Sequence, residues 1–322
     1  MKRTKKITAL ILLVAMTAII ALTGSACGDT GTYTVGICQL TTHVALDAAT
    51  EGFKQALIDE LGEENVTFDY QNAAGDSNTC TTIANNFVSK NVDLIMANAT
   101  AALQASASAT TTIPILGTSI TEYGVALNIE NFTGTVGGNI SGTSDLAPLT
   151  EQAQMIIDLF PEAKTVGLLY CSAEPNSAYQ VKVVREYLEG KGLTCLDFSF
   201  SDSNDVAVVT EKASSDSDVI YIPTDNIAAD CTEIINNICL PKQVPIFAGE
   251  AGICSGCGVF TLSISYYEIG YKTGLMAAQI LTGEADISQM PIEYDPNPVK
   301  KYNAENCSAL GLTAPSDYVV IE

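Results

Sequence analysis

Three acidic residues of this chain directly follow short apolar segments that are typical of buried strands: Glu174, Asp225 and Glu250. A carboxylate at the end of a strand can bind the ammonium group of a small ligand through a charge-assisted hydrogen bond. Acids on solvated loops are also common, so the joint placement of the three counts for more than any one of them. The acids therefore predict a site for a positively charged group.

Hydroxyl and amide donors precede helical patterns at three places: Thr100, Ser144 and the pair Asn176-Ser177. Such donors, together with the N–H groups of a helix N-terminus, suit a carboxylate, although each of them is also an ordinary helix cap. With the three acids, these donors fit a zwitterion such as an amino acid.

The sequence gives little support for a catalytic site, a metal site or a cofactor site. His43 is the single histidine and has no nucleophile near it in sequence, so a cleft wall or a helix cap is favoured over a general base. Cys254-Ser-Gly-Cys257 has redox or zinc spacing, but it is the one such pair, and we expect no metal. The stretch 134–142 lacks the glycine order of nucleotide-binding loops, and we expect no cofactor.

Three strand-like segments recur in the same order in the two halves of the chain, at an offset of 125 to 131 residues. They pair Thr34-Val-Gly-Ile-Cys38 with Thr165-Val-Gly-Leu-Leu169, Val92-Asp-Leu-Ile-Met96 with Ser217-Asp-Val-Ile-Tyr221, and Ile113-Pro-Ile-Leu-Gly117 with Val244-Pro-Ile-Phe-Ala248. A nearly constant offset predicts that the chain consists of two structural repeats.

Helical patterns alternate with these apolar strands, at 45–61, 78–88, 147–159, 178–191 and 227–238. Alternation of this kind predicts an α/β fold of two doubly wound lobes, each with a parallel sheet covered on both faces. Ligands of such sheets collect at the carboxyl ends of the strands. The equivalent strand ends of the two repeats are 39–43 and 172–177, 98–100 and 224–226, and 118–119 and 249–250. Ser119 and Asn226 lie in these segments and join the candidate ligand contacts.

The N-terminus has the pattern of an export signal. Basic residues between Lys2 and Lys6 precede an uncharged, mostly apolar run at 7–23, which ends in Gly24-Ser25-Ala26-Cys27. A cysteine after small residues resembles a bacterial lipobox, so we predict a lipoprotein signal peptide at 1–27 and acylation of Cys27. An uncleaved membrane anchor is the alternative, because the run is almost long enough to span a bilayer.

Charge and cysteine content restrict the partners further. The net charge of −22 disfavours nucleic acid and anionic membrane surfaces. Ten cysteines leave nine if Cys27 is acylated, so at least one thiol has no partner within the chain. We expect the other cysteines to pack as small buried hydrophobic residues.

Several motifs of the chain resemble those of the bacterial ABC-transporter substrate-binding proteins that include tryptophan and tyrosine binders. The stretches that carry the resemblance are His43-Val-Ala-Leu-Asp47, Asp69-Tyr-Gln-Asn-Ala-Ala-Gly-Asp76, Gly142-Thr-Ser-Asp-Leu146, Ser172-Ala-Glu-Pro-Asn-Ser177, Ile222-Pro-Thr-Asp-Asn226 and Tyr266-Tyr-Glu-Ile-Gly-Tyr-Lys-Thr-Gly274. They occur in the family's order and cover nearly the whole chain after the export signal.

The resemblance implies a type I periplasmic-binding fold with three strands crossing between lobes, near 141–145, 262–265 and 294–297. Lobe 1 is then 33–143 plus 264–296, and lobe 2 is 144–263 plus 297–322. It also implies that an amino acid, aromatic by analogy with Trp, Tyr or Phe, binds in the cleft by hinge closure. Its contacts carry over to Thr100, Ser144, Asn176, Ser177, Asp225 and Glu250, with Gln39 and Gln71 nearer the ligand's side chain.

The implied biological setting is an extracytoplasmic lipoprotein of the bacterial cell membrane, whose partners are the permease and ATPase subunits of an ABC importer. Other interpretations stay open at this point. A nucleoside, a sugar or another small organic solute suits the same fold, and so does a sensor that presents its closed form to a receptor. A secreted α/β enzyme would need a nucleophile-base pair or a metal cluster, which the sequence does not show.

Overall fold

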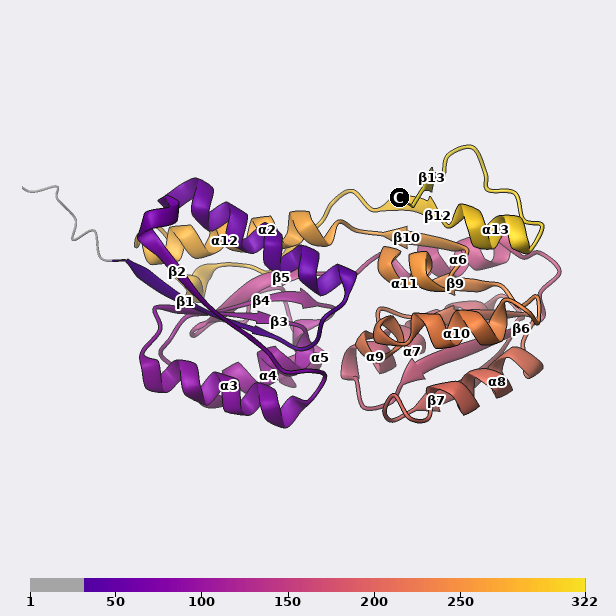
Figure 1. Cartoon of the computed structure of the whole chain (residues 1–322), viewed down its shortest axis with the longest axis horizontal. Coiled ribbons are helices and arrows are strands. Elements are labelled where there is room, and N and C mark those ends of the chain that lie inside the picture. The colour runs from indigo at the N-terminus through magenta and orange to yellow at the C-terminus, as the bar shows by residue number, and fades with distance from the viewer. Residues whose placement is uncertain (1–31, 322) are drawn as a thin grey trace, which may run out of the picture.

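The computed structural model describes residues 32–321, and in it two α/β lobes lie side by side (Figure 1). Each lobe is built on one sheet with helices packed on its faces. This confirms the predicted fold class of two doubly wound lobes. The predicted signal peptide, residues 1–27 with Cys27, lies outside the described residues. Among the described helices, none is both long and apolar enough to cross a membrane.

Lobe 1 contains a six-stranded sheet in which every neighbouring pair is parallel. In sheet order its strands are β2 (Val66–Asn72), β1 (Tyr33–Gln39), β3 (Leu94–Asn98), β4 (Ile115–Ile120), β5 (Ile140–Ser144) and β11 (Glu293–Tyr294).

Lobe 2 contains a seven-stranded sheet that is parallel except where β10 and β12 pair antiparallel. In sheet order its strands are β7 (Thr194–Phe200), β6 (Thr165–Cys171), β8 (Val219–Ile222), β9 (Ile246–Ala248), β10 (Phe260–Ser263), β12 (Val299–Tyr302) and β13 (Val319–Val320).

The internal repeat of the sequence is the structural repeat of the two sheets. The recurring segments form β1 and β6, β3 and β8, and β4 and β9, and each pair holds the same position in its own sheet. Every residue of β3, β4, β8 and β9 is buried. Strands buried on both faces read as continuous apolar runs, which is the pattern that the sequence shows there.

Helices cover both faces of each sheet. In lobe 1, α3 and α4 share one apolar core with the sheet, while α2 and α12 share a core on the other face. The lobe 1 helices are α2 (Val44–Leu61), α3 (Ser77–Lys90), α4 (Thr100–Ala109), α5 (Tyr123–Leu127) and α12 (Tyr266–Leu281), with short 3₁₀ turns at Glu63–Asn65 and Ile287–Gln289.

In lobe 2, the core on one face involves α6, α7 and α13, and the core on the other involves α8 to α11. These helices are α6 (Leu149–Leu159), α7 (Pro175–Gly190), α8 (Val206–Asp216), α9 (Asn226–Asp230), α10 (Thr232–Cys239), α11 (Ala251–Gly256) and α13 (Ala304–Ala309). The single helix predicted over 227–238 is two helices, because the backbone leaves the helical region at Cys231, where φ is −109° and ψ is 14°.

The nine cysteines in the described part of the chain are all buried and carry free thiols. Most of them belong to the apolar cores on the faces of the sheets, as in the case of Cys38, Cys171 and Cys307. The expectation that they pack as small hydrophobic residues is confirmed.

The chain passes between the lobes three times: from β5 to α6, from β10 to α12, and from β11 to β12. Asp295, in the third passage, accepts a hydrogen bond from the backbone N–H of Ser265 in the second, at 3.1 Å. We call these three passages the hinge region, and this hydrogen bond ties the second passage to the third.

Helices α2 and α12 pack unusually closely because glycines face the contact. A Cβ atom at Gly270 would overlap the backbone carbonyl of Ala49, and one at Gly52 would overlap that of Tyr267. Helix α12 begins directly after the second passage, so this contact fixes the hinge end of α12 against lobe 1.

We expect Gly270→Ala to destabilise the protein by about 1–3 kcal/mol, because the methyl group forces two backbones apart in a packed core. Gly190→Ala is the matched control: Gly190 is also helical, but a Cβ there meets nothing within 4 Å. Urea unfolding of the two variants checks this, and equal stability of the two would show that the helix contact is not tight.

Candidate ligand-binding site

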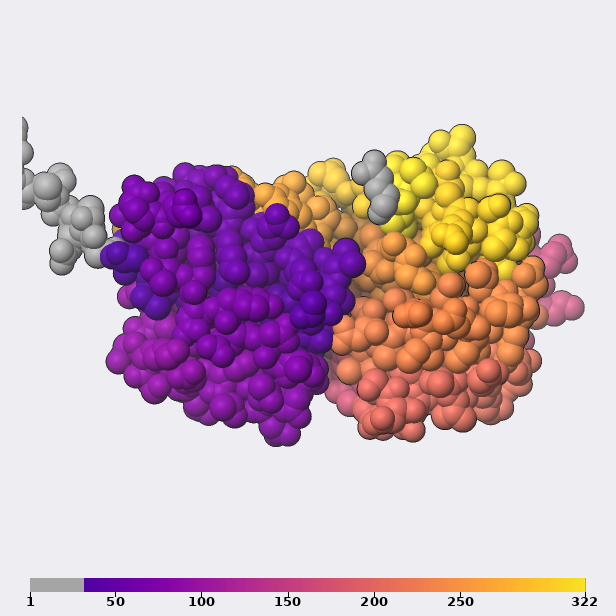
Figure 2. All heavy atoms as spheres, viewed as in Figure 1, coloured from indigo at the N-terminus to yellow at the C-terminus, as the bar shows by residue number. Residues whose placement is uncertain are grey.

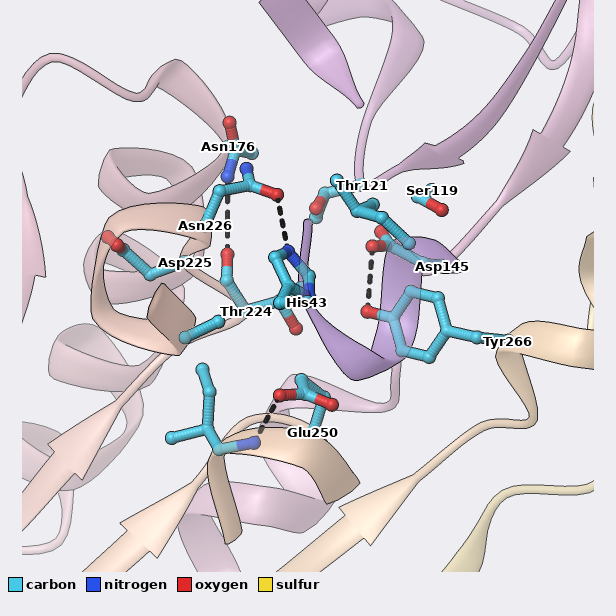
Figure 3. Close-up of a pocket in the computed structure, with 13 residues that line it drawn as sticks. His43, Ser119, Thr121, Asp145, Asn176, Thr224, Asp225, Asn226, Glu250 and Tyr266 are labelled. Carbon is cyan, nitrogen blue, oxygen red and sulfur yellow. Dashed lines mark hydrogen bonds between the residues drawn. The ribbon is translucent and has the colours of Figure 1, made fainter. Parts of the chain in front are cut away.

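A pocket lies between the lobes, at the carboxyl ends of both sheets (Figure 3). Lobe 1 and its hinge contribute His43, Leu46, Ser119, Thr121, Asp145 and Tyr266, and lobe 2 contributes Asn176, Thr224, Asp225, Asn226, Ala229, Glu250 and Ile253. The surfaces of the lobes meet on the face shown in Figure 2. The space left between these side chains holds little more than a water molecule, so the lobes must separate to admit a ligand.

Asp145 is the acid at the hinge end of the pocket. Asp145 directly follows β5 and is 4% exposed. Its Oδ2 accepts a hydrogen bond from the Tyr266 hydroxyl at 3.0 Å. Its Oδ1 is buried and has no hydrogen-bond partner among the described residues. Burial raises the pKa of Asp145 to about 6, although the neighbouring side chains of Thr121 and Tyr266 pull it down in part. An unpaired buried carboxylate oxygen is costly, which makes it a strong acceptor for a cationic group.

Ser119 is the second group in the pocket with an unused polar atom. Its Oγ is buried and lacks a hydrogen-bond partner among the described residues. The pairing of β4 with β5 changes register between Gly117 and Ile120, and Ser119 takes a left-handed φ of 56° there. Strain in a non-glycine residue at a strand end is a frequent mark of a binding site. Ser119 is one of the residues that line the pocket.

Two acids of lobe 2 cap the short helix α9. Asp225 accepts hydrogen bonds from the N–H groups of Ala228, at 2.8 Å, and Cys171, at 2.6 Å. Glu174 accepts from the N–H groups of Asn226 and Ile227 and from the Nδ2 groups of Asn176 and Asn226. Burial raises the pKa of both acids, and in Glu174 the neighbouring Asp225 raises it further. These acids therefore hold α9 in place and form an acidic wall of the pocket.

Glu250 caps α11 in the same way, by accepting from the N–H groups of Gly252 and Ile253. It is 3% exposed, and burial raises its pKa, while the nearby His43 lowers it in part. His43 and Glu250 lie on opposite walls of the cleft (Figure 3).

Direct hydrogen bonds hold the lobes together across the pocket. Nε2 of His43 lies 3.2 Å from Oδ1 of Asn226, and the Thr41 hydroxyl donates to Asp230 at 2.8 Å. The Asn226 oxygen acts as the acceptor, because the amide nitrogen of the same side chain donates to Glu174. The present conformation is therefore closed, with the His43 ring in the middle of the cleft.

The structure brings together five of the eleven candidate contacts from the sequence: Ser119, Asn176, Asp225, Asn226 and Glu250. Two others lie directly behind the pocket wall. Glu174 bonds to Asn226, and Ser177 is fully buried beside Asn176.

The remaining four candidates do not line the pocket. Gln39 is fully buried and bonds to Thr41, Asp47 and Thr50. Gln71 lies on the edge strand β2 and bonds to Asp69, and Thr100 is buried at the start of α4. The Ser144 hydroxyl donates to the carbonyl of Thr121. Hydrogen bonds within lobe 1 occupy three of these side chains, and Thr100 is buried. Their contact with a ligand stays a prediction.

Sequence reasoning missed Asp145 and Thr121 as pocket residues and treated His43 only as a wall or cap, whereas Thr224 belongs to the predicted cleft loop 224–226. The signal for Asp145 was present, because it ends the motif Gly142-Thr-Ser-Asp145 at a predicted crossing. Ser144 was chosen as a helix cap instead. In the described part of the chain, no group of three or more His, Cys, Asp or Glu residues is arranged to hold a metal ion.

The pKa of Asp145 predicts a pH-dependent stability. The pKa is about 6 in the folded protein and about 3.8 unfolded, so the folded state binds more protons between these values. The contribution of Asp145 therefore becomes more favourable as the pH falls from 8 to 5, by about 1–1.5 kcal/mol. In urea unfolding, the stability of Asp145→Asn relative to wild type should be higher at pH 8 than at pH 5 by this amount.

Asp317→Asn is the control for this measurement. The pKa of Asp317 is lowered by its hydrogen bond from Lys300, so its stabilising contribution is complete above its unfolded pKa of about 3.8. The effect of Asp317→Asn should not change between pH 8 and pH 5. A constant effect of Asp145→Asn over the same range would contradict the assigned burial.

The chain is similar to proteins of known class along most of its length. The family described as "ABC transporter substrate binding protein" matches residues 34–317. A tyrosine-binding protein of Clostridioides difficile strain R20291 is 34% identical over 263 residues, which are 80% of this chain and 75% of that protein. These matches confirm the resemblance seen in the motifs.

Two solved structures show the same fold. A Streptococcus pneumoniae ABC domain in complex with L-Trp is 29% identical with a TM-score of 0.85, over 90% of this chain and 100% of that chain. The ligand-free, open structure of a Clostridium difficile substrate-binding protein is 34% identical, over 90% of this chain and 99% of that chain, but its TM-score is 0.69. The lower score despite higher identity indicates that the lobes of the present structure are closed.

Members of this class bind solutes and are not enzymes. The family match over 34–317, the two-lobed fold and the polar pocket at the hinge lead to one identification. The chain belongs to the family of ABC-transporter substrate-binding proteins.

Proposed function

We propose that this protein binds an aromatic amino acid, such as Trp, Tyr or Phe, between its lobes and delivers it to an ABC importer. The observation that carries the proposal is Asp145, which lines the pocket and whose buried Oδ1 lacks a partner within the described chain. An α-ammonium group would satisfy that oxygen and would replace the water lost on burial.

The ligand class is supported by the similar proteins. One relative is a tyrosine-binding protein, and one structural neighbour is a complex with L-Trp. The pocket itself offers apolar surface from Leu46 and Ile253 and the ring of Tyr266. Aromatic rings pair favourably at centroid distances of about 4.5–7 Å, so Tyr266 is the residue that we propose to contact the ligand's ring.

Closure follows from the same geometry. Asp145 and Tyr266 belong to the hinge, and Asn226 and Glu250 belong to lobe 2. A ligand that touches both sides favours the closed state by its differential affinity for it. His43 fills the middle of the cleft in the present conformation, so we propose that its ring moves aside when the ligand binds.

Acylation of Cys27 would keep the protein at the outer face of the bacterial cell membrane, near the permease and ATPase subunits that we propose as partners. The short stretch between Cys27 and β1, which begins at Tyr33, would hold lobe 1 close to the bilayer. More than one acyl chain on the cysteine is needed for firm anchoring, because a single chain binds membranes only marginally.

Asp145→Asn should weaken the binding of L-tyrosine and L-tryptophan by about 10–100-fold, because a hydrogen bond to a charged group is worth about 1.5–3 kcal/mol. Calorimetric titration measures this, and Asp317→Asn should bind like the wild type. The wild-type affinity should also fall as the pH drops below about 6, where Asp145 takes up a proton. Tight binding of only sugars or nucleosides would overturn the proposed ligand class.

Cys27→Ser should move the protein from the membrane fraction to the medium or periplasm of the producing cell. Immunoblots of the fractions check this, with Cys307→Ser as a control, since Cys307 is buried in lobe 2 and should not affect membrane attachment. Retention of the Cys27→Ser protein in the membrane would favour an uncleaved anchor over a lipid.

A further inference from the structure

One segment of lobe 1 contacts one short helix of lobe 2 beside the pocket. The Thr41 hydroxyl donates to Oδ2 of Asp230 at 2.8 Å, and Nε2 of His43 lies 3.2 Å from Oδ1 of Asn226. Asn226 and Asp230 are the first and last residues of α9. Segment 41–43 therefore bonds to both ends of this helix.

The two hydrogen bonds differ in their relation to the ligand. His43 and Asn226 line the pocket, so a ligand competes with their bond for space. Thr41 and Asp230 are not among the lining residues, and Asp230 borders an adjoining groove instead. The Thr41–Asp230 bond can therefore persist when a ligand fills the pocket.

Thr41 is held in position by buried groups of lobe 1. Nε2 of Gln39 donates to the Thr41 carbonyl at 2.7 Å, and Oε1 of Gln39 accepts from the Thr50 hydroxyl at 2.7 Å. Thr41 itself is buried. Its hydroxyl needs no rearrangement of lobe 1 to reach Asp230, so little conformational entropy is lost when the bond forms.

Asp230 receives its environment from the opposite lobe. Partial burial raises the pKa of this carboxyl and Asp47 raises it further, while Thr41 and His43 lower it. All three of these neighbours belong to lobe 1. Among the described residues, Thr41 is the one hydrogen-bond donor to the Asp230 carboxylate. The acid therefore gains this bond only when the lobes are closed.

We propose that the Thr41–Asp230 hydrogen bond is a latch outside the pocket, which stabilises the closed conformation independently of the ligand and sets affinity without affecting selectivity. The inference rests on the hinge closure and the amino acid ligand proposed above. A binding-competent conformation that is populated in advance lowers the apparent Kd in proportion to its population. Loss of the latch therefore weakens the binding of every ligand by the same factor.

Distance measurement between two spin labels tests the latch without any ligand. Ser89→Cys in α3 and Val208→Cys in α8 supply the labelling sites, because both residues are exposed. Helices α3 and α8 lie on the side of the molecule away from the second and third passages, so their separation reports on opening (Figure 1). We expect a closed population in the ligand-free protein. Its ratio to the open population should fall by about two- to tenfold in Thr41→Val.

Two further variants make this measurement specific. Thr82→Val is the matched control, because the Thr82 hydroxyl donates within α3, to the carbonyl of Asn78. Asp230→Ala should act like Thr41→Val, and the double variant should add nothing, since either change removes the same bond. An unchanged distance distribution in Thr41→Val, including the case of a ligand-free protein that is entirely open, would overturn the inference.

Calorimetric titration of the unlabelled protein with L-tryptophan and L-tyrosine completes the test. Both Kd values should rise by the same factor in Thr41→Val, about two- to tenfold, and their ratio should stay constant. Unchanged Kd values, or a changed ratio, would rule out the role assigned to Thr41. Absence of binding by the wild type would contradict the proposed function alone, and the distance measurement would still decide whether the latch exists.

Discussion

Carboxylates buried at the lobe junction, with no lysine or arginine among the residues that line the pocket, are the constraint on which this site depends. Removing a charge from water costs several kcal/mol unless the protein replaces the lost hydrogen bonds. Lobe 2 replaces them with backbone N–H groups of short helices, which hold Asp225, Glu174 and Glu250. Asp145 differs, because one of its two carboxylate oxygens has no hydrogen-bond partner among the described residues. The ligand is the natural partner for that oxygen.

The same constraint links binding to the motion of the lobes. Asp145 lies in the first passage between the lobes, and its partner Tyr266 begins the helix after the second. Closely packed glycines hold that helix against α2, whose N-terminus carries His43 into the cleft. The ammonium group of the proposed ligand would therefore lie beside the hinge region, and in the present conformation His43 contacts Asn226.

Functional and structural uses of a polar residue overlap at this site. The acids that the sequence suggested for an ammonium group are helix caps in the structure, and one residue is both a cap and a pocket wall, as Asp225 shows. A cap on a short helix at the end of a strand lies where ligands of doubly wound sheets bind. The same residue can therefore be both a helix cap and part of the binding site.

Sequence alone determined the two-lobed α/β architecture, because a period of strands and helices repeated at a nearly constant offset is a local pattern. It located most of lobe 2's side of the pocket, where Asn176, Asp225 and Glu250 follow strands. Only the tertiary structure decided that the Gln39 side chain is hydrogen-bonded to Asp47 and Thr50, and that one oxygen of Asp145 has no hydrogen-bond partner in the described chain. Hydrogen-bond satisfaction depends on partners far apart in the chain, and no local pattern records which of them meet.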